Sequence, residues 1–321
     1  MTTSGDDMLV LHNPGSRSGV RVANKLRELA ASMSPAPALD WVPFAELRAI
    51  ERAPRRLIAV GGDGTVNYAA TWLRGFAGTS ELGIVPAGTG NNLARGLGIP
   101  LDPEVAFRAA VMNQTTRLVD TVVVRADDDE REHLMLQSGA LGFPAQVAHR
   151  YDALRKNRLL RAAFVPAGPY IYRILSGAGL ASHAWRRSPR GRAQTTKITV
   201  DGNSYEEDCF ALFLGNERSL GGNFIPCPQA VLDDGLVDIC VVRELPVRRY
   251  PSLFRKVARG THVELTDEVL YLQGKSVTIT LPQASPLLID GDLLASTASY
   301  TLHVLPRTIA LVSAQESGSH L

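Results

Sequence analysis

An aspartate set among glycines is the first feature of this sequence that could do chemistry. The run GGDGT (Gly61–Thr65) follows the apolar residues 57–60 and precedes apolar residues at helical spacing, which predicts a strand, a sharp turn and a helix. Glycines let a backbone approach a ligand closely, and free N–H groups at a helix start favour an anion such as phosphate. The Asp63 carboxylate would repel that phosphate unless a divalent cation or a transferred proton intervened. The turn therefore predicts Mg²⁺-dependent phosphate chemistry, and the alternative is an Asx-type turn.

A second glycine turn repeats this arrangement in PAGTGNNLARGLGIP (Pro86–Pro100). Thr89 can donate a hydrogen bond to a phosphate, and Asn91 and Asn92 lie where a helix N-terminus presents its N–H groups. Neither turn has the spacing of a Walker A loop or of a GxGxxG dinucleotide motif, and the catalytic-loop and DFG elements of protein kinases are absent from the sequence. Each turn alone is compatible with ordinary turn chemistry. Together, at neighbouring strand ends, they predict a cradle for one polyphosphate.

The elements around these turns alternate between strand and helix in the first third of the chain. Strands with their turns are expected within 8–14, 55–62, 81–90 and 117–126, and helices within 19–33, 65–76, 91–98 and 102–114. Such alternation indicates a parallel sheet flanked by helices, which is a Rossmann-like three-layer α/β domain. Ligands bind beyond the carboxyl ends of the strands in such sheets, where both glycine turns would lie.

After about residue 125 the pattern changes to β-rich runs joined by turn residues. These runs occupy 197–216, 235–245, 268–282, 286–294 and 299–306, and 246–260 has the pattern of a single helix. An all-β domain, an antiparallel β-sandwich, is the expected result. We therefore predict an α/β domain over 1–124, with a C-terminal return at about 305–315, and a β-sandwich domain over 125–304.

One segment breaks the charge balance of the chain. Residues 150–192 contain ten Arg or Lys and a single acid, Asp152, whereas the net charge of the whole chain is +2. One interpretation is a solvated basic helical insertion that covers one face of the sheet. The other is a platform for anionic lipid, where each basic residue contributes about 1 kcal/mol. The interleaved aromatic residues Phe164, Tyr170, Tyr172 and Trp185 are typical of interfacial segments.

Composition narrows the classes of protein to which the chain can belong. The 321 residues are 45% hydrophobic and 21% charged, which suits a globular protein with one large or two ordinary domains. A net charge of +2 gives no sign of a nucleic-acid partner. The three cysteines and seven histidines show no metal-ligand spacing, so no zinc site is expected. With no predicted signal peptide or membrane span, we expect a cytoplasmic protein.

The two glycine turns, in this order, resemble the catalytic domain of the diacylglycerol kinase and sphingosine kinase family, especially its soluble bacterial lipid kinases. NPGSRSG (Asn13–Gly19) resembles the opening element of that family. GNERSLGGNFIPCPQAVLDDGLVDI (Gly215–Ile239) is similar to its glycine-rich segment, and LIDGDLL (Leu288–Leu294) to its late acidic motif. The resemblance extends from about residue 8 to 312.

The resemblance implies an ATP-dependent phosphoryl transfer to a lipid hydroxyl, with diacylglycerol as the default acceptor, Mg²⁺ as cofactor and a lipid-binding sandwich domain. The implied Mg²⁺ ligands are the main-chain carbonyls of Val231 and Leu236 and the carboxylate of Asp234. Asp292 falls where the family has a glutamate that is assigned as proton acceptor. Asp290, on the same side if that segment is extended, and Asp63 are the other candidate catalytic carboxylates. The implied ATP-binding residues are Asn13, Gly61, Gly62, Asp63, Gly64, Thr65, Val66, Asn67, Gly88, Thr89 and Asn91.

Three departures from the family pattern bear on activity. Asn92 stands where the family often has an aspartate, Asn223 replaces a glycine, and LDWVPFAELRA (39–49) offers no equivalent of a threonine that the family has before its first glycine motif. An NAD kinase, which also carries GGDGT, and a non-catalytic or weakly active lipid-binding relative therefore stay open as alternatives. Monoacylglycerols, sphingoid bases, ceramides and phosphatidylglycerol stay open as acceptors.

The expected partners follow from the same resemblance and from the basic segment. They are ATP, a lipid substrate and, transiently, an anionic membrane surface to which the cytoplasmic protein would bind peripherally. No nucleic acid is expected. An exposed edge of the sandwich could pair two copies of the chain into a homodimer.

Overall fold

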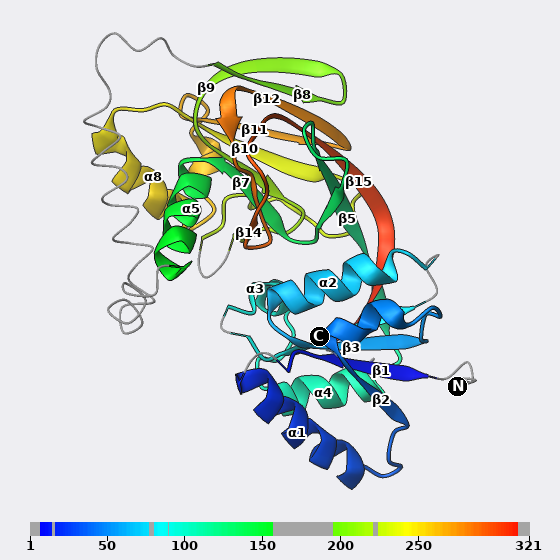
Figure 1. The fold of residues 1–321 in the computed structure, drawn as a ribbon. Helices are drawn as coiled ribbons and strands as arrows, with labels where there is room; N and C mark the ends of the chain where they lie inside the picture. The colour runs from blue at the N-terminus through cyan, green and yellow to red at the C-terminus, as the bar shows by residue number, and fades with distance from the viewer. Residues whose placement is uncertain are drawn as a thin grey trace. The chain divides into compact units, whose positions relative to one another are not determined.

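The computed structural model describes residues 7–14, 17–76, 80–88, 90–156, 195–220 and 224–313 (Figure 1). The chain folds into two compact units. The first consists of residues 1–121, 231–235 and 305–321, and the second of residues 122–230 and 236–304. Some features singled out in the sequence lie outside the described residues. They are Thr89, Asn223 and most of the basic segment 150–192.

A parallel sheet forms the centre of the first unit. Its strands are β1 (Met8–His12), β2 (Leu39–Pro43), β3 (Arg56–Gly61), β4 (Glu81–Pro86) and the end of β15 (Thr297–Val312), in the order β2-β1-β3-β4-β15. Every residue of β3 is buried, as expected for a central strand of a sheet that is covered on both faces. Gly61 lies opposite Pro86 in the β3–β4 register, so both strands end at the same level.

Helices cover both faces of this sheet. α2 (Asp63–Leu73) lies on one face, and α1 (Arg17–Ser32) and α4 (Pro103–Met112) lie on the other (Figure 1). The short helix α3 (Asn92–Gly96) follows β4, and the 3₁₀ helix η1 (Phe44–Ala49) follows β2. The structure confirms the predicted parallel α/β fold of this part of the chain.

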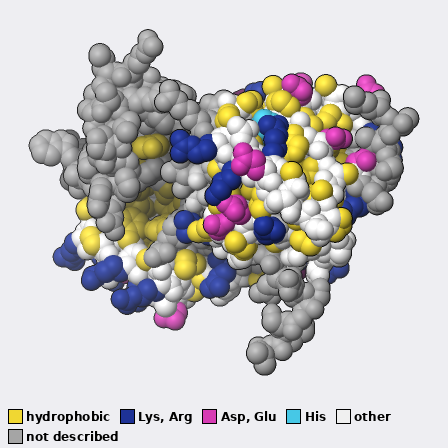
Figure 2. Space-filling model, turned by 90° about the horizontal axis from the view of Figure 1, so that it is seen from below, with side chains coloured by type: hydrophobic (Ala, Val, Ile, Leu, Met, Phe, Trp, Pro, Cys, Tyr) yellow, Lys and Arg dark blue, Asp and Glu magenta, His cyan; other side chains and the backbone are white. Residues whose placement is uncertain are grey.

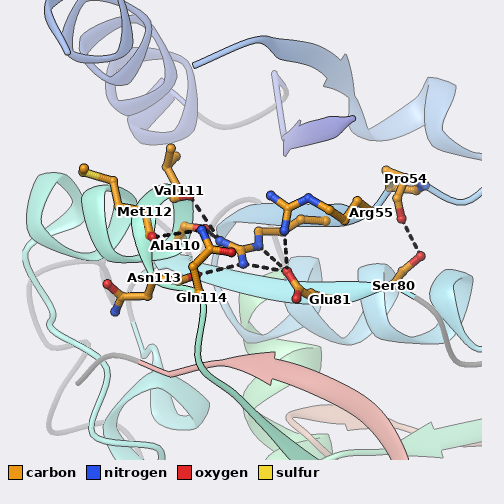
Figure 3. Close-up of polar contacts among 10 residues, drawn as sticks. Pro54, Arg55, Ser80, Glu81, Ala110, Val111, Met112, Asn113 and Gln114 are labelled. Carbon is orange, nitrogen blue, oxygen red and sulfur yellow. Dashed lines mark hydrogen bonds and ion pairs between the residues drawn. The ribbon is translucent and has the colours of Figure 1, made fainter. Parts of the chain in front are cut away.

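A buried arginine, Arg56, joins the sheet to α4, and Figure 3 labels its partners Glu81, Ala110, Val111 and Asn113. Arg56 of β3 is fully buried, and its Nε donates to Oε2 of Glu81 on β4 at 2.6 Å. Its Nη1 donates to the carbonyls of Ala110 and Val111 at 2.7 and 3.2 Å, and its Nη2 to the carbonyl of Asn113 at 2.8 Å. These carbonyls have no partner within a helix, so the guanidinium caps the C-terminus of α4. Burial lowers the pKa of Arg56, and Glu81 opposes that shift.

The second unit is an antiparallel β-sandwich, which confirms the second half of the predicted fold class. Its two sheets share β9 (Asn203–Gly215), because the first half of β9 pairs with β8 (Thr195–Val200) and the second half with β7 (Ser138–Gly142) and β10 (Val237–Arg243). The other strands are β5 (Thr116–Ala126), β6 (Glu132–Met135), β11 (Val269–Gly274), β12 (Ser276–Ser285), β13 (Leu288–Ile289), β14 (Asp292–Leu293) and the first part of β15, which pairs with β12. Residues from both sheets form its core, among them Val124, Leu212, Ile239 and Tyr300.

Two of the described helices lie against this sandwich. α5 (Phe143–Lys156) follows β7, and α8 (Tyr250–Val257) forms within the predicted helical run 246–260, after the 3₁₀ helix η3 (Val247–Arg249). A further 3₁₀ helix, η4 (His262–Glu264), leads to β11. In the part of the chain that the structure describes, no helix is both long enough and apolar enough to span a membrane.

Candidate functional site

The first glycine turn forms the junction between β3 and α2. Gly62 is the N-cap of α2, with extended φ and ψ of −93° and −173°, and no side-chain hydrogen bond caps this helix. A Cβ built at Gly64 would meet no described atom within 4 Å, so the first turn of α2 presents bare backbone. The free N–H groups and the positive end of the helix dipole make this N-terminus suitable for a phosphate.

The two glycine turns contact each other through their backbones. A Cβ built at Gly62 would lie 3.2 Å from Gly88 Cα, and one built at Gly88 would clash with Gly62 Cα. The Ala87 N–H also donates to the Gly61 carbonyl at 2.8 Å. The sequence reasoning assigned these glycines to close approach of a ligand. The structure gives Gly62 and Gly88 a further reason, because only glycines allow the two turns to touch.

The Asp63 side chain bonds to the second turn, not to its own loop. Its carboxylate accepts hydrogen bonds from the main-chain N–H groups of Asn92 at 3.1 Å and Leu93 at 3.0 Å. Asp63 thus begins α2 and at the same time caps the N-terminus of α3. The Asx-type alternative placed this bond within one loop, and neither interpretation of the sequence anticipated a bond that links the turns.

The second turn is closed by an asparagine in the left-handed region. Asn91 has φ of 50° and ψ of 43°, its Oδ1 accepts from the Gly88 N–H at 2.9 Å, and its Nδ2 donates to the Gly88 carbonyl at 3.0 Å. Asparagine tolerates this conformation better than most residues. The Gly88 N–H and the Asn91 side chain are therefore engaged with each other, and their part in the site is to shape the turn.

The remaining predicted ATP-binding residues of the first unit have different surroundings. Val66 and Thr65 are buried, with Thr65 filling the space beside Gly61. Oδ1 of Asn67 accepts from Oγ1 of Thr71 at 3.4 Å. Asn13 is half-buried and directly follows β1, the neighbour of β3. The sheet thus brings Asn13 and both glycine turns to the carboxyl ends of adjacent strands, as predicted.

The loop with the proposed Mg²⁺ ligands is held by an aspartate that the sequence reasoning missed. Asp120 of β5 is fully buried, and its carboxylate accepts from the Gly235 N–H at 2.6 Å and the Arg307 N–H at 2.7 Å. Its own N–H donates to the Leu232 carbonyl at 2.6 Å. Asp120 therefore connects residues 231–235 to β5 and β15. The available signal was an acid within the apolar run LVDTVVV, where an ionised side chain needs buried partners.

An ion pair adds a second attachment for the same loop. Arg117 donates through Nε and Nη2 to the two carboxylate oxygens of Asp233, at 3.0 and 2.8 Å. The hydrogen bonds from Arg117 lower the pKa of the Asp233 carboxyl group. Asp234, the predicted ligand, is exposed, and so is Val231.

The donor chemistry of this loop fits a hard cation. The proposed ligands are two main-chain carbonyls, of Val231 and Leu236, and the Asp234 carboxylate, all of which offer oxygen. Among the described residues, no three His, Cys, Asp or Glu side chains converge as they would in a zinc site. A cation held here would therefore depend on one carboxylate, backbone carbonyls and water, an arrangement compatible with Mg²⁺.

The two late aspartates differ in their surroundings, which corrects the expectation that they point to one side of an extended strand. Asp290 and Gly291 have φ of 46° and 94° and form the two-residue turn between β13 and β14. The Asp290 carboxylate accepts from the N–H groups of Leu136, Gln137 and Ser138 at 2.7, 2.9 and 3.0 Å. Asp292 is exposed. Both belong to the second unit, whereas Asp63 and Asp234 belong to the first.

Comparison with known proteins identifies relatives for both halves of the chain. Residues 7–124 match the family described as "Diacylglycerol kinase catalytic domain", and residues 181–313 match the "YegS C-terminal NAD kinase beta sandwich-like domain". A protein named "Diacylglycerol kinase" from Mycobacterium tuberculosis strain H37Rv is 32% identical over 246 residues, 76% of this chain and 72% of the relative. A "Probable lipid kinase YegS-like" from Pseudomonas aeruginosa strain UCBPP-PA14 is 29% identical over 88% of this chain and 96% of its own length.

Solved structures show the same fold. The crystal structure of a diacylglycerol kinase from Bacillus anthracis str. Sterne superposes with a TM-score of 0.65, covering 97% of this chain and 98% of that structure. The two sequences are 20% identical, so this similarity concerns the fold alone.

Proposed function

Because the chain belongs to the diacylglycerol kinase catalytic-domain family, we propose that it is an ATP- and Mg²⁺-dependent lipid kinase. It transfers the γ-phosphoryl group to a lipid hydroxyl, with diacylglycerol as the expected acceptor. The observation that carries this proposal is the joint structure of the two glycine turns, which are fixed to each other by the Gly62–Gly88 contact and by the Asp63 carboxylate on the N-terminus of α3.

The first turn of α2 is the proposed site of the ATP phosphates. A Cβ built at Gly64 would meet no described atom within 4 Å, and no side-chain hydrogen bond caps this helix. Phosphoryl transfer depends mainly on positioning and on stabilising charge, so donors that are fixed before the substrate binds are the most effective. Asp63 contributes by fixing both turns, which makes it a positioning residue in this proposal.

The loop 231–236 is the proposed Mg²⁺ site. The bound cation would neutralise charge on the phosphate oxygens as the phosphoryl group transfers. Within the protein, Asp120 and Arg117 hold the loop, and Asp234 and the carbonyls of Val231 and Leu236 supply the oxygens.

Asp292 is the proposed general base. Its exposed carboxylate accepts the proton of the lipid hydroxyl while that oxygen forms a bond to the γ-phosphorus, and the bond from the γ-phosphorus to the bridging oxygen of ADP breaks. Asp290 cannot serve equally well, because three N–H groups already bond to its carboxylate. We assign Asp290 to shaping the turn that presents Asp292.

Membrane contact is part of the same proposal. A kinase whose acceptor is a bilayer lipid must reach that lipid at the membrane surface, so we propose a cytoplasmic protein that binds anionic membranes transiently. A homodimer built on a sandwich edge remains a prediction.

A lipid-panel assay tests the proposed function. The protein is incubated with γ-labelled ATP, with Mg²⁺ or with EDTA, and with diacylglycerol, monoacylglycerol, sphingosine, ceramide, phosphatidylglycerol or NAD⁺. We expect labelled phosphatidic acid only when Mg²⁺ and diacylglycerol are present. Labelled NADP⁺ would instead identify an NAD kinase. If no acceptor is labelled although ATP binds in calorimetry, the chain is a lipid-binding relative without turnover.

A further inference from the structure

An aromatic stack fixes α8 to the sandwich. Tyr250, Leu253 and Val257 of α8 are buried in a core cluster with β9, β10 and β11. The Tyr250 ring stacks on Phe210 of β9 with centroids 4.0 Å apart, and Phe210 stacks in turn on Phe143 of α5 at 4.7 Å. α5 and α8 therefore cover the same face of one sheet, and the inner face of α8 has little freedom to move.

The remaining surface of α8 and its flanks is strongly basic. Arg248, Arg249, Arg255 and Arg259 are exposed, and Lys256 is half-buried. Residues 246–263 contain no acid. Among the described residues, only one of these five cations has a carboxylate as ion-pair partner, Arg249, which bonds to Glu268 at 2.7 Å. Figure 2 shows Lys and Arg side chains gathered beside hydrophobic surface at the left, the side on which Figure 1 draws α5 and α8. We name Arg248, Arg255, Lys256 and Arg259 the α8 basic face.

The charge of the other described residues of the second unit has the opposite sign. Outside residues 157–194 and the five cations at 248–259, the unit has nine Arg or Lys and eighteen Asp or Glu. In the described part of the unit, the positive charge at 248–259 is thus separated from an acidic remainder, while residues 157–194 add seven Arg and no acid. Such separation steers and orients a protein toward an anionic partner.

We propose that the α8 basic face is a docking surface for an anionic lipid bilayer. This proposal rests on the proposed function, because a kinase that acts on a bilayer lipid must bind a membrane. It assigns membrane docking to α8 and its flanks, whereas the sequence pointed to the segment 150–192. A bilayer matches basic side chains spread over α8 and its two flanks, because its charge is spread over a plane and requires no complementary pocket. The sandwich carries the charges on its surface, so docking needs no rearrangement of the core.

Vesicle sedimentation of the full chain tests this assignment. The probes are vesicles of phosphatidylcholine mixed with phosphatidylglycerol and vesicles of phosphatidylcholine alone, each at low and high salt. The test variant is Arg248→Gln/Arg255→Gln/Arg259→Gln. The control variant is Arg21→Gln/Arg52→Gln/Arg108→Gln, which removes three exposed cations from the first unit. Each basic residue near an anionic surface contributes about fivefold, so the test variant should bind anionic vesicles about 100-fold more weakly than wild type and the control about equally.

Activity separates docking from catalysis. The test variant should phosphorylate dispersed short-chain diacylglycerol at the wild-type rate, whereas KM for vesicle-embedded diacylglycerol rises and kcat does not change. If the chain has no kinase activity at all, the sedimentation result still decides the docking surface.

Three results would overturn the proposal. One is equal sedimentation of wild type and test variant with anionic vesicles, and another is wild-type binding that is insensitive to salt and to lipid charge. The third is a change in oligomeric state of the test variant without vesicles, measured by light scattering, which would make the face a contact between copies of the chain.

Discussion

The Asp63 carboxylate lies 3.0 Å from the main-chain nitrogen of Leu93, at the N-terminus of a helix that follows the next strand of the sheet. This bond and its neighbour to Asn92 fix the spacing of the two turns that we propose hold ATP. An aspartate that looks catalytic in the sequence therefore has a positioning task in the fold.

Asp63→Asn should lower kcat/KM by about 100-fold or more, because an amide offers one acceptor oxygen and loses the charge that the α3 dipole favours. The measurement is steady-state kinetics with ATP varied. Asp102→Asn is a matched control, because Asp102 caps α4 through two N–H bonds, at 2.8 and 3.1 Å, and neither bond involves a glycine turn. Both variants should lose about 1 kcal/mol of stability, and only the first should lose activity. Equal loss of activity in both would show that Asp63 acts merely through stability.

Asp120→Asn should raise the Mg²⁺ concentration needed for half-maximal activity. The asparagine amide would direct its N–H₂ group toward the N–H of Gly235 or Arg307, leaving a buried donor without a partner and loosening the 231–235 loop. Calorimetry of Mg²⁺ binding in the presence of a non-hydrolysable ATP analogue provides a readout that is independent of turnover. Asp128→Asn, an exposed acid in the β5–β6 loop, is the control. Unchanged Mg²⁺ affinity in Asp120→Asn would remove this aspartate from the metal site.

Substitution of Asp292 should reduce activity, whereas substitution of Asp290 should reduce stability. Asp292→Asn should abolish most turnover while thermal unfolding changes by less than about 0.5 kcal/mol, because the side chain is exposed. Asp290→Asn should cost about 1–3 kcal/mol of stability, because its carboxylate accepts three N–H bonds. Circular-dichroism melts and initial rates on the same samples distinguish these effects. Asp292→Glu, with its longer reach, should restore activity, and no rescue would weaken the assignment of a general base.

Stability should fall in mild acid because of buried histidines. His262 is fully buried, its Nε2 lies 2.9 Å from the Pro226 carbonyl and 3.5 Å from Cys240 Sγ, and burial lowers its pKa. A depressed histidine pKa gives stability that is present above the unfolded pKa near 6.5 and is lost as pH falls toward the folded pKa. Each such histidine contributes a slope of at most about 1.4 kcal/mol per pH unit. His12 shifts in the same direction through burial and Arg27.

Chemical denaturation between about pH 7.5 and pH 5.5 measures this slope. His262→Gln keeps a donor for the Pro226 carbonyl but does not titrate, so its slope should be shallower than that of the wild type. His303→Gln is the control, because His303 is exposed. A wild-type slope in His262→Gln would exclude this histidine as a source of acid sensitivity.

Local patterns predicted the parts of the fold whose signals lie within a few residues. β3, β4 and α4 appeared where apolar runs or helical spacing indicated them, and both glycine turns lie at the strand ends. β2 and η1 were not anticipated, because LDWVPFAELRA is only partly buried and shows neither a strand nor a helix period clearly. Helix α2 begins at Asp63, two residues before the predicted run. Its first turn includes Gly64, and a glycine at that position gave no helical signal in the sequence.

The contacts within the site were harder to predict, since they join residues far apart in the sequence. Asp63 with Leu93, Asp120 with Gly235 and Asp290 with Leu136 are side-chain to main-chain bonds that exist only after the sheets have formed. The Asp290–Gly291 turn is an exception. An Asp-Gly pair between apolar residues is a strong signal for a tight hairpin, and the assumption of an extended segment overlooked it.

The seam between Gly62 and Gly88, where no side chain fits, restricts how this protein can diverge. A side chain at Gly88 would clash with Gly62 Cα, and one at Gly62 would lie 3.2 Å from Gly88 Cα, so a substitution in one loop requires an adjustment of the other. Substitution should meet the least steric resistance at Gly64, where a Cβ would meet no described atom within 4 Å. Residues that line the rim of the site can therefore change more readily than the two glycines at which the loops touch.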